Sequence, residues 1–320
     1  MGEAKRAAVI YFPGRVDRKK LDAALQSTLQ SLRWEPALWL PTSAEETGAI
    51  QAQRAAAQNA THLLVAGGDG TVREVLQSVV ENNLQVTVGI LPVGTGNVLA
   101  RNLNIDVTDF GGAVKRALLG NRHPIDIGVA KIIFESGDRR EMLFSVMAGI
   151  GLDAKIMINT NPKLKRQIGW VAYIDGGLRA LPTRFEKMLV EVDGKEPRRM
   201  KLVSLLIGNA GWLPGNINLM PDAKLDDGLL DVAVIGPRRF WNWIDFWSRV
   251  TVGNNVIRVN RVAKQLLEAT ANVKTLENLS GSKIRVTPDR PIHLQIDGDP
   301  LGLITQIEFE VKPRAVTVRT

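Results

Sequence analysis

The first hundred residues alternate between short apolar runs and longer stretches with helical spacing. Apolar runs long enough for buried strands lie at 7–12, 37–40, 61–66 and 86–92. Between them, apolar residues recur three and four positions apart, or alanine and glutamine dominate, which predicts helices over 17–32, 43–58 and 71–82. Strands that alternate with helices in this way are typical of a parallel sheet with helices on both faces. We therefore expect an α/β fold for this part of the chain.

The pattern changes after about residue 124. Strand-like runs separated by glycine, proline or aspartate dominate the remainder, and only 165–181 and 239–252 show helical spacing. A length of 320 residues also suits about two domains. We expect one domain over 1–124 and a mainly β domain over 125–313.

Composition narrows the chemistry of the chain. It has no cysteine, and its three histidines lie far apart in the sequence. Disulfides, thiolate metal sites, a cysteine nucleophile and a local histidine metal motif are thereby excluded, whereas a Mg²⁺ site with oxygen ligands stays open.

The chain is basic, with 41 lysines and arginines against 33 acidic residues and a net charge of +8. This excess favours an anionic partner: nucleotide phosphate, nucleic acid or an acidic membrane surface. No nucleic-acid motif accompanies the charge, so nucleic acid is not the expected partner. The sequence shows no targeting signal and no apolar run that approaches a bilayer span. We expect a cytoplasmic protein that can attach to the inner face of the membrane.

A glycine-rich loop follows the third apolar run and leads directly into a helix. It consists of Gly67, Gly68, Asp69, Gly70 and Thr71. Glycines allow positive φ angles and a close approach of the backbone to a ligand, and the N-terminus of the helix attracts anions. Asp69 would repel a phosphate unless it holds a cation or a proton. The simpler alternative is a tight turn in which Asp69 caps the helix.

A second loop repeats this pattern after the fourth apolar run. Gly94, Thr95, Gly96 and Asn97 lead into a helix on which Arg101 lies one turn further and could face the same anion. Two such loops at the ends of two strands favour a phosphate site over ordinary turns. The segment 149–154 also fits a loose dinucleotide fingerprint, but it lies in the β-rich half without a βαβ setting.

These motifs together resemble the bacterial lipid kinases of the diacylglycerol kinase catalytic-domain family, whose catalytic domain is shared by sphingosine and ceramide kinases. The resemblance rests on GGDGT followed by Glu74, on LPVGTGNVLARNL, and on segments 145–154, 208–235 and 294–300. It extends along most of the chain. It implies a nucleotide-binding α/β domain like those of phosphofructokinases and NAD kinases, and a β-sandwich-like lipid domain. The last strand, near 314–320, would return to the first domain, and ATP would lie in the cleft between the two.

Nucleotide contacts follow from the resemblance, residue by residue. The candidates are Pro13, Gly14, Thr42, Gly67, Gly68, Asp69, Gly70, Thr71, Val72, Arg73, Thr95 and Asn97. The resemblance also implies a structural Mg²⁺ held by Asp227 and by the carbonyl oxygens of Lys224 and Leu229, which suits a hard cation. A hairpin turn at 226–228 is a further interpretation, and the two are compatible.

The loop Asp297-Gly298-Asp299 matches the general-base loop of the family. The family pattern has Glu where this chain has the shorter Asp299, which leaves open whether Asp299 or Asp297 reaches the acceptor hydroxyl. Asp69 is a third candidate, as base or as ligand of the Mg²⁺ bound to ATP, and a simple turn at Asp-Gly is the plain alternative.

Two other positions depart from the family pattern. The turn after the first strand lacks its usual Asn and reads Phe12-Pro13-Gly14-Arg15, and Arg73 stands where an Asn usually follows GGDGT. We hypothesise that Arg15 or Arg73 supplies another phosphate contact.

The stretch 238–250 carries aromatic residues on one helical face, and Trp241 lies off that face beside Arg238 and Arg239. Packing on the sandwich explains the aromatic face, and docking on an anionic membrane explains the Trp–Arg group.

We predict a lipid kinase that uses ATP and Mg²⁺, with diacylglycerol as the expected acceptor and phosphatidate as the product. Alternatives are a kinase for a sphingoid base or polyprenol, an NAD kinase or sugar-phosphate kinase, and a non-catalytic sensor of lipid or nucleotide. The sequence also allows a homodimer.

Overall fold

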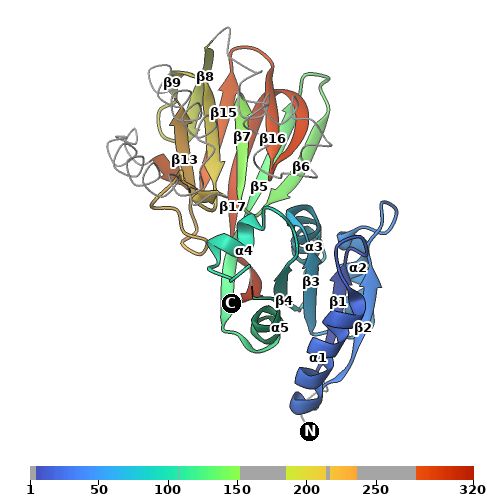
Figure 1. Cartoon of the computed structure of the whole chain (residues 1–320). Coiled ribbons are helices and arrows are strands. Elements are labelled where there is room, and N and C mark those ends of the chain that lie inside the picture. The colour runs from blue at the N-terminus through green and yellow to red at the C-terminus, as the bar shows by residue number, and fades with distance from the viewer. Residues whose placement is uncertain (1–4, 108, 152–184, 214–216, 236–278) are drawn as a thin grey trace, which may run out of the picture.

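The computed structural model describes residues 5–107, 109–151, 185–213, 217–235 and 279–320. They form an α/β unit and a β-rich unit, and the long strand β17 runs from one into the other (Figure 1). No helix among these residues is long and apolar enough to cross a membrane. The predicted helices at 165–181 and 239–252, with Arg238, Arg239 and Trp241, lie outside the described residues.

The α/β unit has a parallel sheet in the order β2-β1-β3-β4. Its strands are β1 (Arg6–Tyr11), β2 (Glu35–Pro41), β3 (His62–Gly67) and β4 (Thr87–Pro92). Its helices are α1 (Arg18–Leu32), α2 (Gly48–Ala57), α3 (Asp69–Glu81), α4 (Val98–Asn102) and α5 (Phe110–Leu119).

Helices cover both faces of this sheet, which explains the nearly continuous apolar runs of β1, β3 and β4. On β1, Val9 faces the cluster that contains residues of α1 and α5, whereas Ile10 faces the cluster of α2 and α3. Successive side chains of a strand point to opposite faces, so a strand covered on both sides needs an uninterrupted apolar run. The predicted α/β class and the four strands are confirmed.

Two helices differ from the prediction. The helix expected over 43–58 begins only at Gly48, because the Ser43 hydroxyl accepts bonds from the backbone N–H groups of Glu45 and Glu46 and forms a local turn. Helix α5 was not predicted; it begins after Asp109, whose carboxylate accepts a bond from the Gly112 N–H at 2.9 Å.

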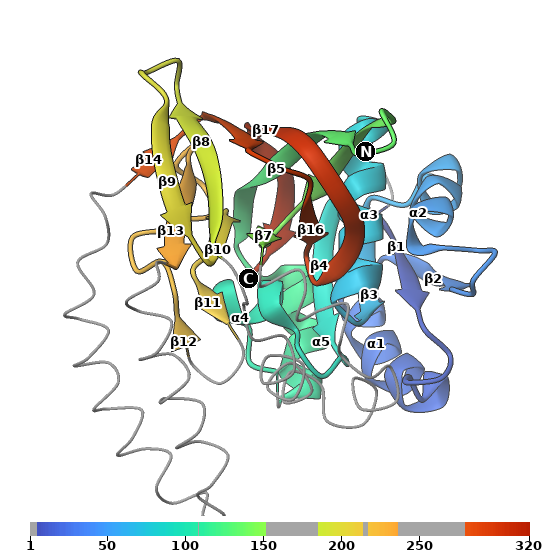
Figure 2. The same cartoon turned by 90° about the horizontal axis from the view of Figure 1, so that it is seen from above.

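The second unit is built from antiparallel strands (Figure 2). In chain order they are β5 (Arg122–Phe134), β6 (Arg139–Phe144), β7 (Met147–Gly151), β8 (Glu186–Val192), β9 (Arg198–Leu202), β10 (Ser204–Gly208), β13 (Leu230–Ile235), β14 (Leu279–Gly281), β15 (Lys283–Pro288), β16 (Ile292–Ile296) and β17 (Asp299–Arg319). The short strands β11 (Trp212–Leu213) and β12 (Ile217–Asn218) pair separately. One apolar cluster, with Phe144 against Phe309, fills this unit. The segment 149–151 belongs to β7, which pairs antiparallel with β10 and β16, so the dinucleotide fingerprint lacks its βαβ setting.

Strand β17 pairs with strands of both units. Near its start it pairs with β16, in its middle with β5 and β15, and at Thr317–Arg319 it runs parallel to β4. The predicted return of the last strand is therefore present, and β5 accompanies β17 across the junction.

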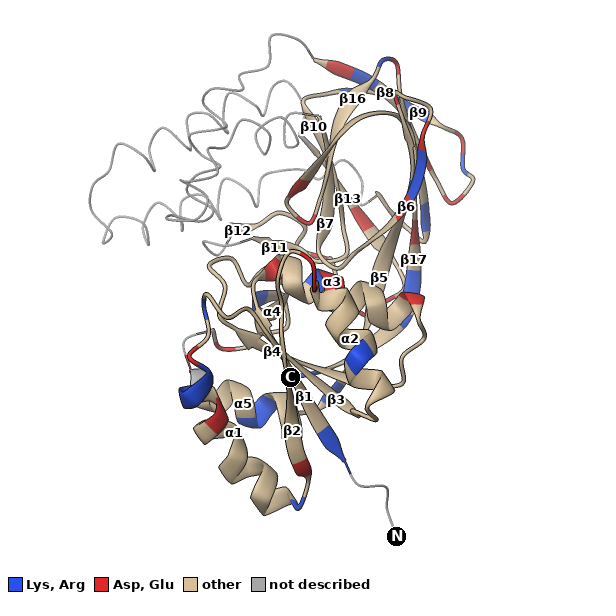
Figure 3. Ribbon diagram, turned by 90° about the vertical axis from the view of Figure 1, so that its right-hand side faces the viewer, with Lys and Arg blue, Asp and Glu red and all other residues tan. Residues whose placement is uncertain are grey.

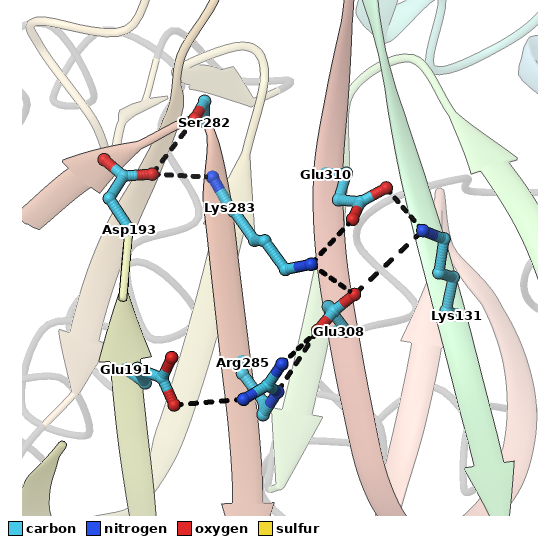
Figure 4. A network of polar contacts seen from close by, with 8 residues as sticks. All are labelled: Lys131, Glu191, Asp193, Ser282, Lys283, Arg285, Glu308 and Glu310. Atoms are coloured by element: carbon cyan, nitrogen blue, oxygen red, sulfur yellow. Dashed lines mark hydrogen bonds and ion pairs between the residues drawn. The ribbon is translucent and has the colours of Figure 1, made fainter. Parts of the chain in front are cut away.

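Positions of basic and of acidic residues both occur along the strands of the second unit (Figure 3). Lys131, Lys283 and Arg285 pair with acidic residues of β8 and β17 in one network (Figure 4). Exposed ion pairs of this kind each contribute little to stability, and the positive and negative charges of this network pair with one another within the sheet.

Candidate functional site

The two glycine loops lie side by side at the ends of neighbouring strands. Strand β3 pairs in parallel with β4 so that Gly67 stands opposite Pro92, and both loops leave the same edge of the sheet. A side chain added at Gly94 would meet the Gly68 Cα at 2.8 Å, so the two backbones touch. Asp69 joins them, because its carboxylate accepts a 2.6 Å bond from the N–H of Val98.

The first loop forms the open N-terminus of α3. A Cβ added at Gly70 would find nothing within 4 Å, whereas one at Gly67 would collide with Thr71. In the described part of the chain the N–H groups of Gly70 and Thr71 have no acceptor. Free N–H groups at the start of a helix attract anions, so this surface fits a phosphate.

The loop glycines serve close approach rather than backbone strain. None of Gly67, Gly68, Gly70, Gly94 and Gly96 has a positive φ angle, so these loops do not use the left-handed backbone that glycine allows. Asn97 takes that conformation instead, with φ 48°. Its side-chain amide bonds both the N–H and the carbonyl of Gly94 and fixes the second loop.

The other nucleotide candidates differ in accessibility. Val72 is buried in the core and its N–H bonds the Gly68 carbonyl. Thr42 is buried at the end of β2, where its N–H and hydroxyl both bond Tyr11. Exposed candidates are Pro13, Gly14 and Thr95. Arg101 donates to the carbonyl of Gly96, within its own loop.

Burial raises the pKa of Asp69 above its ordinary value, and hydrogen bonds from Val98 and Asn97 oppose the rise. The carboxylate serves the junction of the two loops and caps the start of α4. The plain interpretation of Asp69 as a cap therefore describes one of its contacts, although the helix that it caps is α4 rather than α3.

The two aspartates of the base loop have different environments. Asp297, with φ 45°, accepts bonds at 2.9–3.0 Å from the N–H groups of Ser145, Val146 and Met147, and a further bond from the Ser145 hydroxyl. Burial raises its pKa, and these donors oppose the rise. The Asp299 side chain, in contrast, is 48% exposed. Of the two, only Asp299 presents a carboxylate that a substrate can reach.

Arg73 connects the base loop to the phosphate end of α3. Its guanidinium pairs with the Asp299 carboxylate at 2.6 Å and donates to the Ile296 carbonyl at 3.2 Å. The side chain is only 14% exposed. Arg73 is therefore engaged by the base loop, whereas Arg15 stands exposed beside Gly14.

The segment that holds Asp227 is a turn that precedes β13. The Asp227 carboxylate accepts a bond from the Leu229 N–H, and Gly228 has φ +76°. Strand β13 pairs with β10 and β14, so this turn does not close a hairpin between paired neighbours.

Negative charge gathers beside this turn. Burial, together with the charges of Asp227 and Asp222, raises the pKa of Asp231 to about 6. Among the described residues, however, no three acidic or histidine side chains lie close enough together to hold a metal ion, so a cation here would also need backbone carbonyl ligands.

A polar junction missed in the sequence supports both the turn and β17. Asp126, fully buried on β5, accepts 2.6 Å bonds from the N–H groups of Gly228 and Arg314. Asn209, also buried, donates to the carbonyls of Asp126 and Ser145. An aspartate within an apolar strand run could have indicated this junction in the sequence, because a buried charge needs hydrogen-bond partners.

Two family models match the chain. Residues 7–130 match the diacylglycerol kinase catalytic domain, and residues 145–320, more than half of the chain, match the YegS C-terminal NAD kinase beta sandwich-like domain. A diacylglycerol kinase of Bacillus subtilis (strain 168) is 28% identical over 305 residues, which cover 94% of this chain and 91% of the relative. A diacylglycerol kinase of Staphylococcus aureus (strain MRSA252) is 30% identical over 238 residues, 72% of this chain and 70% of the relative. A probable lipid kinase YegS-like of Klebsiella pneumoniae (strain 342) is 29% identical over 265 residues, 82% of this chain and 78% of the relative.

Solved structures show the same fold. A diacylglycerol kinase from Bacillus anthracis str. Sterne has a TM-score of 0.74 at 20% identity and covers 98% of this chain and 96% of its own. An NAD kinase from Archaeoglobus fulgidus, solved in complex with ATP, has a TM-score of 0.50 at 14% identity and covers 98% of this chain and 93% of its own. The predicted fold and family are confirmed: this chain belongs to the family of bacterial diacylglycerol kinases and YegS-like lipid kinases.

Proposed function

We propose that this protein is an ATP- and Mg²⁺-dependent lipid kinase that phosphorylates the hydroxyl of diacylglycerol and forms phosphatidate. The observation that carries the proposal is the contact between Asp299 and Arg73, because it places a reachable carboxylate beside the helix whose N-terminus is open for phosphate. Relatives named diacylglycerol kinase and lipid kinase support the lipid acceptor.

In the proposed reaction, the N–H groups at the start of α3 bind phosphate oxygens and orient the triphosphate. Asp299 accepts the proton of the lipid hydroxyl while the hydroxyl oxygen forms a bond to the γ-phosphorus of ATP. The bond between the γ-phosphorus and the oxygen that bridges to the β-phosphate breaks, and ADP is released. Asp297 holds the loop through the backbone of Ser145, Val146 and Met147. Asp69 remains a candidate for the Mg²⁺ that accompanies ATP.

A second Mg²⁺ would be held by Asp227 and by the carbonyl oxygens of Lys224 and Leu229, next to the charges of Asp222 and Asp231. When bound, it supplies positive charge that stabilises this acidic turn. We place this ion in a structural role, since Gly228 of the same turn bonds buried Asp126.

The test is to incubate the protein with labelled ATP, Mg²⁺ and a total lipid extract and to identify the labelled product. Labelled phosphatidate is expected, and it should disappear in Asp299→Asn. Asp289→Asn, which changes an aspartate in the exposed pair with Arg199, is the matched control and should keep the activity.

Other products would reassign the protein. A phosphorylated sphingoid base or polyprenol would change the acceptor, and phosphorylated NAD or fructose 6-phosphate would replace the lipid. ATP or lipid binding without any transfer would make the protein a sensor. Vesicle binding with and without anionic lipid tests the membrane contact, and the mass in solution tests the homodimer.

A further inference from the structure

Arg73 bridges the base loop from one end to the other. One guanidinium nitrogen donates to the carbonyl of Ile296, just before the loop, and another pairs with Asp299 at its end. The loop is short, so these two contacts fix both of its ends on one side chain. Since Arg73 is the fifth residue of α3, the loop is attached near the start of the element that begins at the proposed phosphate-binding end.

The rest of the loop is already held by its own unit. Asp297 is bound by the backbone of residues 145–147, and the Gly298 N–H donates to the Gln295 side chain at 2.8 Å. Ile296 is fully buried on β16. The Asp299 carboxylate takes no part in these hydrogen bonds, and it is oriented by Arg73.

Arg73 is also nearly withdrawn from solvent, unlike an arginine that waits for a ligand. Its side chain is 14% exposed, whereas that of Arg199 in the surface pair with Asp289 is 63% exposed. A guanidinium forms bonds in a fixed planar fork, so a partner held by it has a defined direction as well as a defined distance.

The two partners are two of the three positions at which this chain departs from the pattern that the resemblance implies: Arg73 stands at an Asn position and Asp299 at a Glu position. The structure places these two departures in direct contact. The long arginine side chain reaches a carboxylate that is one methylene shorter than that of glutamate.

We propose that Arg73 is a positioning residue that holds Asp299 at the phosphate end of α3, and that the two residues function as a matched pair. The proposal rests on the lipid kinase function proposed above. It replaces the hypothesis that Arg73 contacts a phosphate.

The experiment is a double-mutant cycle with Arg73→Asn, Asp299→Glu and the double variant, measured with ATP and diacylglycerol in mixed micelles. Each single change should lower kcat about tenfold or more, with the KM for ATP within about twofold of wild type, because the phosphate site is intact. The double variant should be no worse than the poorer single variant, so the two effects are far from additive. Arg73→Lys should recover part of kcat, since it keeps the charge and loses the fork.

The cycle Arg199→Asn with Asp289→Glu is the matched control, with a 2.5 Å pair away from the loops, and should be silent. Melting temperatures exclude unfolded variants, and Arg73→Lys keeps the test valid if Arg73→Asn does not fold. Additive effects, or a raised KM for ATP with unchanged kcat in Arg73→Asn, would contradict the proposal that Arg73 positions Asp299. The proposed lipid kinase function would then still stand. A wild-type protein that phosphorylates no lipid would overturn both.

Discussion

Two aspartates separated by one glycine show how strongly the environment of a residue decides its role. Asp297 points inward and satisfies three backbone N–H groups, whereas Asp299 lies half exposed against a guanidinium. Both fit a general-base loop by residue type. Their hydrogen bonds separate a residue that builds the loop from one whose carboxylate is accessible.

Asp297→Asn should therefore cost stability and Asp299→Asn should not. An amide at position 297 offers one oxygen where the carboxylate offers two, and its NH₂ group faces backbone donors, so we expect a loss of about 2–4 kcal/mol in the free energy of unfolding. Asp299→Asn should change it by about 1 kcal/mol or less. Urea unfolding measures both, and equal losses would contradict the assigned roles.

His62 gives the chain a pH-dependent stability. It is buried at the start of β3 against Trp34, with its Nδ1 atom 3.0 Å from the Thr61 hydroxyl. Burial and the positive charges of Arg319, Lys5 and Arg122 lower its pKa to about 4 from an ordinary 6.5. The folded chain thus keeps this imidazole neutral at a pH where the unfolded chain binds a proton.

Stability should fall as the pH decreases from about 6.5 towards 4, because protons bind the unfolded state first in that window. Melting temperatures at pH 7 and pH 5 measure the effect. His62→Gln should reduce the difference between the melting temperatures at pH 7 and pH 5, although it lowers stability at pH 7. An unchanged difference would show that other groups cause it.

At the scale of elements, one helix supplies the cap of another. Thr47 precedes α2 but makes no side-chain cap, and the Glu74 carboxylate on α3 accepts the Gly48 N–H at 2.8 Å instead. A Cβ at Gly48 would lie 3.0 Å from the Thr71 carbonyl, so the two helices touch at this point. Glu74 is thus a packing residue within a motif that otherwise concerns phosphate.

Glu74→Ala should lower the free energy of unfolding by about 1 kcal/mol, the usual cost of a lost cap. Glu74→Gln keeps an acceptor oxygen and should lose less than half as much. Chemical unfolding of the two variants compares them, and the KM for ATP should stay unchanged in the glutamine variant. Equal losses would argue against the cap.

Elements were predictable from sequence where one local cause decides them. The strands of the α/β unit are apolar because helices cover both faces, and this pattern is visible without a structure. The start of α2 and the whole of α5 depended on local polar turns at Ser43 and Asp109, which periodicity does not report. The glycine loops could also be predicted, because their residues are consecutive and form a pattern that is visible in the sequence alone.

The contacts within the candidate site could not be predicted in this way. Arg73 meets Asp299, and Asp126 meets Gly228 and Arg314, across most of the chain. No local pattern encodes such pairs, because they depend on how β17 and β5 cross between the units. Local motifs predict candidates for the base, and the fold shows that Asp297 and Asp299 differ in hydrogen bonds and exposure.

At the scale of the whole molecule, a single buried carboxylate links three distant segments. Asp126 on β5 bonds the turn of Gly228 and the bend of β17 at Arg314, which has φ 49°. Ordering of that turn should therefore stabilise the crossing between the units as well as the turn itself.

Millimolar Mg²⁺ should raise the melting temperature of the wild-type protein, and EDTA should reverse the rise, because a ligand of the folded state stabilises it. Asp227→Asn should abolish most of the response. Asp226→Asn, which changes the neighbouring aspartate beside His123, is the matched control and should keep it. An equal rise in melting temperature in all three proteins would show that Asp227 is not a ligand of the metal.

The course of β17 also has a consequence for biosynthesis. Thr317–Arg319 form the neighbour of β4 on the side opposite β3, so the sheet that carries the phosphate loops is completed by residues made after the entire second unit. Until they leave the ribosome, β4 is an open edge, which is a hazard for strand pairing with other chains. Most of the α/β unit is thus translated before the second unit, and its sheet is completed after it.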